Sequence, residues 1–455
     1  MMRTIAVHKN SCMYSCVLSI CLSLSFYLCV VNFLIKKYLQ THKEEMFSFL
    51  AELVAVRSVQ NEPNGKFPFG KKPAKALEKM LNKCSEYGFV TENIDNYVGS
   101  ADFGEGEVAL GILSHLDVVP EGDGWESDPF VMKRKDGRLI GRGTSDDKGP
   151  AVASLFALRA VKELGIPLKK GVRLIFGTNE ENGSADLAYY RTKRNLPPMV
   201  FTPDGEYPVI NGEKGMLRVY FSADYDGFWI SGGEVINAVP QRCSVGDGER
   251  CSTIYSGKSA HASTPEKGEN AITCFLAHHG TKNKILSSLA SLFPHGEWNG
   301  KSIFGDISGI TCVLSLLNTK ENRLHGGIDI RFPLDKTKSE ISEIICGKLR
   351  EIGFEIDRCD GSEPHYTEEN SDFVRSLLRV YEKITGEKGY CITIGGGTYV
   401  HEIDGGVAFG ATFPEEDCHI HGCGEFITEE SLLKNAEIMA ETIVEICGMQ
   451  QHMNI

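Results

Sequence analysis

Six acidic or histidine side chains fall where apolar runs of the chain give way to glycine-rich turns. They are His115, Asp117, Asp146, Asp147, Glu180 and Glu181. Open α/β sheets gather ligands at the carboxyl ends of their strands, where such turns begin. Imidazole and carboxylate groups together suit divalent transition metals. Three such segments in sequence predict a metal site, in preference to a solvated acidic loop beside a core histidine.

His115 and Asp117 stand two residues apart in the apolar run 112–119. On a strand, residues at this spacing point to the same face. An imidazole that ligates a metal commonly donates its other N–H to a carboxylate. We therefore expect Asp117 to orient His115.

The pattern around these residues alternates between short apolar runs and longer amphipathic stretches. Strands are expected at 89–94, 108–119 and 172–177, and helices at 73–87, 152–164, 184–194, 372–385 and 428–447. This alternation predicts an α/β fold, a mostly parallel sheet with helices on both faces. A β-rich stretch with helical segments near 270–289 and 338–352 interrupts it and predicts an inserted α+β domain.

The expected division of the chain follows from these changes of pattern. It comprises an apolar extension (1–31), a first catalytic part (32–211), the inserted domain (212–365) and a second catalytic part (366–455). A length of 455 residues also favours two domains over one.

Charge and cysteine usage exclude two classes of protein. The net charge of −13 argues against a nucleic-acid partner, whose phosphates attract basic surfaces. The 15 cysteines are odd in number, and most lie inside apolar runs, which indicates reduced core residues instead of a secreted disulfide framework.

The amino-terminal extension is apolar, and residues 11–35 carry no charged side chain. The run is long enough for a bilayer span, but basic residues flank it on both sides and do not choose an orientation. Three interpretations stay open: a signal anchor, an amphipathic extension, or upstream sequence translated from an early start codon. A membrane partner is expected only if residues 12–35 are a true anchor.

Ordered motifs from about residue 32 to the end of the chain resemble a known enzyme family. They include Ser-His-Leu-Asp-Val-Val-Pro (114–120), Gly-Arg-Gly-Thr-Ser-Asp-Asp-Lys-Gly-Pro (141–150), Gly-Thr-Asn-Glu-Glu-Asn-Gly (177–183), Pro-Asp-Gly-Glu (203–206), Gly-Lys-Ser-Ala-His-Ala-Ser (257–263), Asp-Ile-Arg-Phe-Pro (329–333) and Gly-Gly-Gly-Thr-Tyr (395–399). The family is that of the co-catalytic metallopeptidases, which includes aminoacylases, carboxypeptidase G and succinyl-diaminopimelate desuccinylase. Within it, the motifs are most similar to the dipeptidase V, carnosinase-like branch.

The resemblance implies a dinuclear centre that binds two divalent ions per subunit, zinc or manganese and possibly cobalt. Residue by residue, it implies that His115 and Asp204 bind one ion, and that Glu181 and a late histidine bind the other. Asp146 would bridge the two ions, in a peptide link to Asp147 that is often cis in such folds. His421 lies four residues before Glu425, the family spacing, and is preferred to His419 as the late ligand.

The same resemblance assigns the reaction. Glu180 would be the general base for a water that bridges the metals, and Asp117 would assist through His115. The inserted domain would be a lid, with His261 and Asn237 stabilising the tetrahedral intermediate and Arg331 pairing with the substrate carboxylate. Gly396 and Gly397 would let the backbone approach the substrate closely.

The function expected from all this is a metal-dependent dipeptidase that hydrolyses short unblocked peptides. An N-acyl-amino-acid deacylase or desuccinylase with the same site is one alternative, and a catalytically silent homologue that binds metal or peptide is another. The branch implies a monomer in the cytoplasm, with membrane anchoring through the amino-terminal segment as the alternative location.

Overall fold

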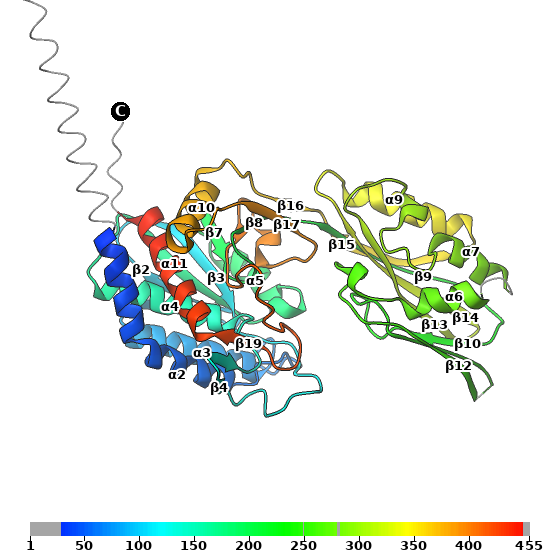
Figure 1. Ribbon diagram of the computed structural model, residues 1–455, viewed down its shortest axis with the longest axis horizontal. Helices are drawn as coiled ribbons and strands as arrows, with labels where there is room; N and C mark the ends of the chain where they lie inside the picture. Colours follow the sequence, from blue (N-terminus) through cyan, green and yellow to red (C-terminus); the bar gives the residue numbers. More distant parts are fainter. Residues whose placement is uncertain (1–28, 249, 280–282, 449–455) are drawn as a thin grey trace, which may run out of the picture. The chain divides into compact units, whose positions relative to one another are not determined.

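The computed structural model describes residues 29–248, 250–279 and 283–448 and divides the chain into two compact units (Figure 1). Of the described residues, unit 1 comprises those up to Ile210, Glu368–Cys391 and those from Thr398 onward, and unit 2 comprises those within Asn211–Thr367 and Ile392–Gly397. Most of the apolar extension lies outside the described residues. Within the described ranges, no helix combines the length and apolar character required to cross a membrane.

Unit 1 is built around a sheet whose strand order is β1-β2-β6-β3-β7-β18-β8. These strands are β1 (Val90–Ile94), β2 (Val98–Phe103), β3 (Val108–His115), β6 (Gly171–Gly177), β7 (Met199–Thr202), β8 (Val209–Glu213) and β18 (Val407–Ala408). The central strands β6, β3, β7 and β18 run parallel, whereas β1, β2 and β8 pair antiparallel with their neighbours.

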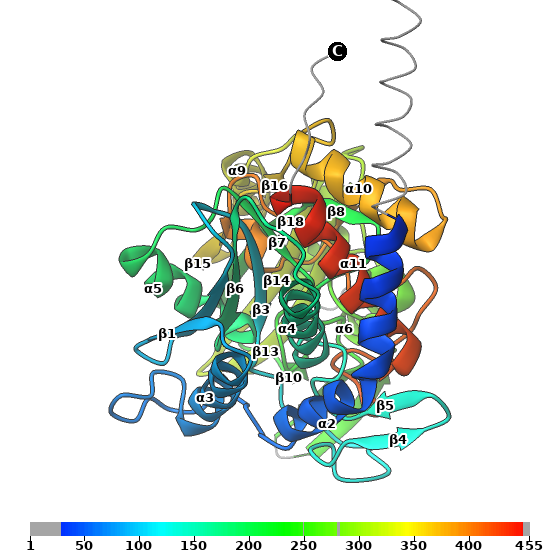
Figure 2. The same ribbon diagram turned by 90° about the vertical axis from the view of Figure 1, so that its left-hand side faces the viewer.

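Helices cover both faces of this sheet, because its central strands are apolar on both sides. The helices of unit 1 are residues 29–41, α2 (Lys43–Val54), α3 (Lys71–Glu86), α4 (Lys148–Glu163), α5 (Ala185–Lys193), α10 (Asp372–Thr385) and α11 (Glu429–Cys447). Along β6, Leu174 and Phe176 belong to the large core that includes α4 and α11, while Ile175 packs in a separate cluster with Leu187 of α5. Figure 2 shows α4 and α11 on one side of the strands and α5 on the other.

A small second sheet joins two distant segments of unit 1. It has the order β19-β5-β4, with β4 at Lys133–Lys135, β5 at Arg138–Ile140 and β19 at Phe426–Thr428. The pair Phe426–Ile140 brings the segment before α11 beside the Gly-Arg-Gly motif. Thr428, the expected N-cap of α11, accepts a hydrogen bond from the N–H of Ser431.

Unit 2 is an antiparallel sheet with helices packed on one face. Its strand order is β12-β11-β10-β13-β14-β9-β15. The strands are β9 (Gly215–Asp224), β10 (Trp229–Gly232), β11 (Arg242–Asp247), β12 (Arg250–Ser256), β13 (Thr311–Lys320), β14 (Arg323–Phe332) and β15 (Glu355–Ser362). The helices are α6 (Ala271–His279), α7 (Lys284–Leu292), α8 (Lys301–Phe304) and α9 (Lys338–Glu351), and they share one hydrophobic core with the sheet. Residues 211–213 of β8 belong to unit 2, and there β8 pairs with the short strand β16 (His365–Tyr366) through Gly212 and Glu213. The short strand β17 (Cys391–Ile394) also pairs with β8.

These two units confirm the expected fold class, a largely parallel α/β sheet accompanied by an α+β unit. Three details differ from the expectation. Strand β3 ends at His115, so Asp117 lies beyond the strand. Strand β2 was not expected, because small residues stand there in place of alternating apolar ones. These positions are small because α3 packs closely against them: a Cβ at Gly99 would lie within 3 Å of Leu77 and Leu81. The stretch 270–289 forms α6 and the first part of α7 instead of one helix.

Candidate metal centre

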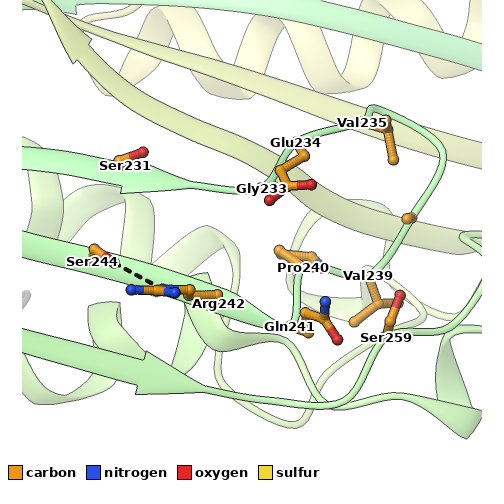
Figure 3. Close-up of a pocket in the computed structure, with 11 residues that line it drawn as sticks. Ser231, Gly233, Glu234, Val235, Val239, Pro240, Gln241, Arg242, Ser244 and Ser259 are labelled. Carbon is orange, nitrogen blue, oxygen red and sulfur yellow. Dashed lines mark hydrogen bonds between the residues drawn. The ribbon is translucent and has the colours of Figure 1, made fainter. Parts of the chain in front are cut away.

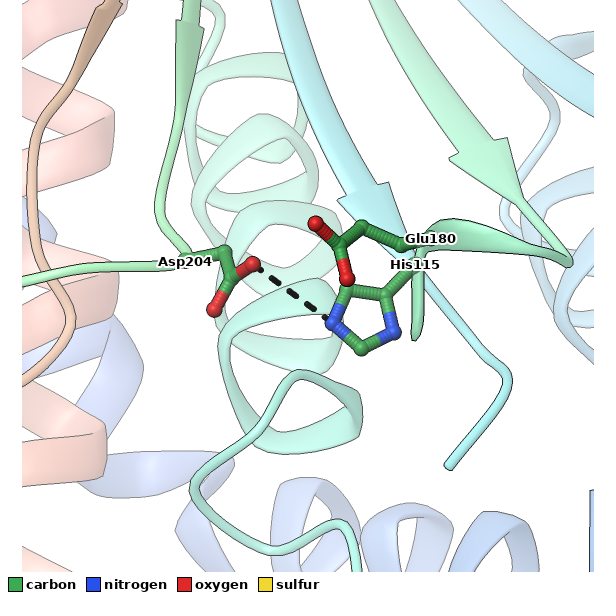
Figure 4. Close-up of side chains that lie close together, drawn as sticks. All are labelled: His115, Glu180 and Asp204. Carbon is green, nitrogen blue, oxygen red and sulfur yellow. Dashed lines mark ion pairs between the residues drawn. The ribbon is translucent and has the colours of Figure 1, made fainter. Parts of the chain in front are cut away.

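Three adjacent parallel strands place the first ligand candidates at one edge of the sheet. His115 is the last residue of β3, Glu180 follows β6, and Asp204 follows β7. Carboxyl ends of parallel neighbours meet at the same edge, so these side chains converge (Figure 4). One ligand atom of each lies within 4.8 Å of the others, and the same is true of the group His115, Asp146 and Glu181.

Asp146 lies between two imidazoles. Its Oδ1 is 2.9 Å from Nε2 of His115, and its Oδ2 is 2.8 Å from Nε2 of His421. His115 Nε2 is also 3.6 Å from Oδ2 of Asp204, and His421 Nε2 is 3.2 Å from Oε1 of Glu181. A carboxylate shared between two such pairs is the arrangement that a bridging ligand requires. The peptide bond between Asp146 and Asp147 is cis.

Asp117 is fully buried and contacts both His115 and the backbone of the two glutamates. Its Oδ1 is 3.5 Å from Nδ1 of His115, and its two carboxylate oxygens accept hydrogen bonds from the N–H groups of Glu180 and Glu181 at 3.2 Å. Nδ1 of His115 lies closer, at 3.1 Å, to the backbone carbonyl of Asp117. Asp117 therefore orients the imidazole chiefly through its main chain, while its carboxylate fixes the two adjacent glutamates, although it does not lie on the strand.

The charges of this cluster do not balance without a cation. Burial, together with the neighbouring charge of Asp204, holds the pKa of Glu180 well above its usual range. Burial and the charge of Asp146 raise the pKa of Glu181 to about 7. Burial lowers the pKa of His421, but its hydrogen bonds with Asp146 and Glu181 outweigh this and raise it to about 11. The carboxyl groups have raised pKa values, and the imidazole of His421 keeps its proton. Both effects are expected at a site where a bound cation would stabilise ionised carboxylates and neutral imidazoles.

Two buried atoms at the centre support the same conclusion. Nε2 of His115 and Oδ1 of Asp146 are inaccessible to solvent and face each other at 2.9 Å, yet neither makes a hydrogen bond to any described residue. Buried polar atoms are nearly always paired. The donor set of imidazoles and carboxylates fits zinc, manganese or cobalt.

The structure separates the two late histidines. His421 contacts Asp146 and Glu181, whereas the ring of His419 packs edge-on against Phe426, with 5.7 Å between ring centroids. All five expected ligands therefore lie together in unit 1: His115, Asp146, Glu181, Asp204 and His421. Glu180, expected as the base, also falls within the ligand groups.

Arg142 and Glu425 form a contact at the centre that was not predicted from the sequence. These buried side chains form an ion pair of 2.6 Å beneath the centre. Oε1 of Glu425 accepts hydrogen bonds from the N–H groups of Gly143, Ser145 and Asp146 at 2.9–3.2 Å. Both residues lie in motifs that the sequence showed: Arg142 in Gly-Arg-Gly, and Glu425 four residues after His421. No feature of the sequence indicated that the two side chains form a pair.

The remaining expected site residues belong to unit 2. Asn237 and His261 are neighbours there, because Ala238 pairs with His261 and the N–H of Ala262 donates to the Asn237 carbonyl at 2.9 Å. Nδ1 of His261 lies 2.6 Å from Oγ of Ser263. A Cβ at Gly396 would meet only Ile394, at 4.0 Å, whereas one at the adjacent Gly395 would meet Ser263 at 2.8 Å.

Arg331 is buried and already engaged in unit 2. Its Nε and Nη2 donate to the carboxylate of Asp329 at 2.6 and 3.2 Å, and its Nη1 donates to the Gly395 carbonyl at 3.0 Å. A guanidinium has five N–H donors, so two remain for another acceptor. Gly397 lies beside this contact in the same segment and is exposed.

Comparison with known proteins identifies the family. The model of peptidase family M20/M25/M40 matches residues 111–445, which is more than half of the chain. The chain belongs to this family. The β-Ala-Xaa dipeptidase of Lactobacillus delbrueckii subsp. lactis is 32% identical over 90% of this chain and 98% of its own length.

Solved structures share the fold at lower sequence identity. Human carnosine dipeptidase 1 superposes with a TM-score of 0.63 at 16% identity, covering 90% of this chain and 98% of its own. The YXEP protein of Bacillus subtilis, described as a dinuclear metal-binding peptidase of family M20, superposes with a TM-score of 0.53 at 12% identity, over 89% and 98% of the chains. The expected metallopeptidase class and the resemblance to the dipeptidase V, carnosinase-like branch are confirmed.

Proposed function

We propose that this chain cleaves short peptides with free termini, dipeptides above all, at a dinuclear metal centre. The observation that carries the proposal is the buried cluster around Asp146, in which carboxylates outnumber imidazoles and Glu180 lies beside the ligand candidates. The 32% identical relative is a β-Ala-Xaa dipeptidase, which supports free dipeptides as the substrate class.

His115 and Asp204 would hold one ion, Glu181 and His421 the other, and Asp146 both. Bound divalent ions supply Lewis acidity, which polarises the scissile carbonyl and makes water easier to deprotonate. Zinc, manganese and cobalt all suit these donors.

Glu180 is the proposed general base, and its position supports that role. Asp117 fixes the N–H of Glu180, whose carboxylate lies near His115 and Asp204, where bound cations would keep it ionised and able to accept and return a proton. It would take a proton from the attacking water and deliver it to the amine that leaves. Glu181, the adjacent residue, is then free to serve as a ligand.

Unit 2 supplies the proposed substrate contacts. Asn237 and His261 would stabilise the negative charge that develops on the carbonyl oxygen. Arg331 would offer its two remaining N–H donors to the carboxylate of the peptide, and Gly396 and Gly397 would contribute backbone contacts. The assignment of unit 2 as a lid, a monomeric state and a cytoplasmic location all stay proposals.

The test is hydrolysis of free dipeptides and of N-acyl amino acids by the full chain, with added manganese or zinc and with a chelator. We expect metal-dependent turnover of free dipeptides and a loss of at least about 1,000-fold in Glu180→Gln. Glu180→Gln should still bind metal, and Glu105→Gln, which changes an exposed glutamate, should retain full activity.

Other outcomes distinguish the alternatives. Turnover of N-acyl amino acids in preference to dipeptides would identify a deacylase with the same site. Absence of turnover on both substrate sets by metal-loaded protein would contradict an enzymatic role and leave a metal- or peptide-binding homologue. Activity of Glu180→Gln near that of the wild type would overturn the assignment of the base.

A further inference from the structure

Unit 2 contains a cavity of about 460 Å³ that the proposed reaction does not use (Figure 3). Strands β10 and β11 are paired from Trp229–Gly246 to Gly232–Cys243 and then separate into the loop 233–241. The cavity lies where they separate. Its polar lining residues are Ser231, Glu234, Gln241, Arg242, Ser244 and Ser259.

The alternation of side chains along β11 gives the cavity its polar character. Cys243 and Val245 point into the hydrophobic core that carries the helices of unit 2. Arg242 and Ser244 therefore point away from that core, on the face that also presents Ser231 of β10. In Figure 3 the Arg242 side chain runs along the strand toward Ser244, whose Oγ accepts from Nε at 3.3 Å.

Two opposite charges line the cavity without pairing. Arg242 and Glu234 are both exposed, and no oppositely charged side chain of the described residues lies within ion-pair distance of either. They do not reach each other, so a ligand between them could satisfy both. Val239 and Pro240 add an apolar wall.

We propose that this cavity binds a dipeptide-like zwitterion, with Arg242 pairing with its carboxylate and Glu234 with its ammonium group. A planar guanidinium matches a carboxylate through two parallel hydrogen bonds, and the serine hydroxyls and the Gln241 amide suit a peptide group. Sites of this kind combine a few fixed polar groups with an apolar wall. The choice of a dipeptide, as opposed to another zwitterion, rests on the proposed function.

The cavity adjoins the segment of unit 2 that the family resemblance connects with the reaction. The loop that forms one wall contains Asn237, and Ser259 stands two residues before His261. Ala238, another lining residue, pairs with His261 across a β-bridge. A peptide in the cavity would thus contact the backbone that holds both side chains.

The test is calorimetric titration of chelator-treated full-length protein with L-alanyl-L-alanine, its C-terminal amide and its N-acetyl derivative. Without metal there is no turnover, so the result does not depend on Glu180. We expect the free dipeptide to bind at least about tenfold more tightly than either blocked form, since each blocked form lacks one charge-assisted contact.

Variants assign the site. Arg242→Ala should weaken binding of the free dipeptide by at least about tenfold and abolish its advantage over the amide, while Arg242→Lys should restore part of the affinity. Glu234→Gln should remove the advantage over the N-acetyl form. Arg350→Ala removes an exposed arginine of α9, which packs on the opposite face of the sheet, and should bind as the wild type does.

Two results would overturn the proposal. One is equal affinity of the wild type for the free dipeptide and both blocked forms, including no binding of any of them. The other is unchanged binding in folded Arg242→Ala, with the fold verified by circular dichroism. Failure of the dipeptidase proposal would be seen separately, as absent turnover by metal-loaded protein.

Discussion

His421 connects two candidate ligands, because its Nε2 approaches both Asp146 and Glu181. His419 stands two residues earlier in the same loop and makes neither contact. We predict that His421→Ala lowers kcat/KM by at least about 100-fold and weakens metal binding, as loss of a ligand should. Titration with zinc against a chromophoric chelator measures the second effect.

His419→Ala is the matched control, because it removes the same side chain from the same loop. It should retain metal affinity and activity within about threefold of the wild type. Equal losses in the two variants would show that the loop, and not the Nε2 contact of His421, determines metal binding.

Asp186 is a buried carboxylate just outside the centre. It accepts hydrogen bonds from the Tyr399 hydroxyl at 2.5 Å and from the N–H groups of Thr178 and Asn179 at 2.6 and 2.8 Å. Burial, followed by the charge of Asp117, raises its pKa from 3.8 to about 6. The hydrogen bonds oppose this shift but do not cancel it.

A raised pKa in the folded state has a definite consequence for stability. The folded protein holds this proton more tightly than the unfolded chain does, so the contribution of Asp186 is greatest below pH 4 and falls as the pH rises to about 6. We predict that the stability of the wild type relative to Asp186→Asn falls by on the order of 2 kcal/mol between pH 4 and 7. Urea unfolding at several pH values measures this difference, and a difference that is constant or grows with pH would contradict it.

At the scale of elements, the pairing of β5 with β19 aligns the two loops that carry Asp146 and His421. The Arg142–Glu425 ion pair continues this alignment, since Arg142 Nη2 also donates to the His421 carbonyl at 3.1 Å. Both side chains are buried, with relative exposures of 1% and 0%. The pair therefore positions two loops and does not contact the reacting groups.

We predict that Arg142→Met destabilises the protein by about 3–5 kcal/mol, because it leaves Glu425 buried and charged without its partner. It should also weaken zinc binding at least about tenfold at a temperature where the variant is folded. Arg57→Met breaks the exposed pair of Arg57 with Glu121 and should cost less than about 1 kcal/mol, with zinc affinity unchanged. Full zinc affinity in folded Arg142→Met would refute the positioning role.

The elements that the sequence predicted well are those with a clear period or a local signal. The helix 372–385 has the expected bounds, and α11 begins at its expected N-cap Thr428. Strand β2 was missed because Gly99 and Ala101 are small, and only the approach of α3 explains why they are buried there. Hydrophobic periodicity alone likewise could not predict where α6 ends and α7 begins.

The site was predictable where ligands follow strands, because strand ends converge in any parallel sheet. His115, Glu180 and Asp204 are of this type. Arg142 and Glu425 are 283 residues apart in the chain, and their ion pair depends on the pairing of β5 with β19. No local sequence pattern predicts that pairing. The engagement of Arg331 by Asp329 was equally hidden, although the two residues are only two apart.

At the scale of the whole molecule, the two largest hydrophobic cores of the described residues lie in different units. One lies in unit 1 and includes α4 and α11, and the other lies in unit 2 and includes α6 and α9. All five expected metal ligands are in unit 1. A ligand stabilises only the structure that binds it, by an amount set by its concentration relative to its dissociation constant.

We therefore predict two unfolding transitions in differential scanning calorimetry, of which zinc or manganese raises only one. Metal at 100 times its dissociation constant should add about 2.7 kcal/mol to the stability of unit 1, which is a shift of about 5 °C for a unit of this size. Leu289→Ala, in the core of unit 2, should lower only the transition that metal does not move. A single transition, or equal shifts of both on adding metal, would show that the two cores unfold together and that metal binding stabilises unit 2 as well.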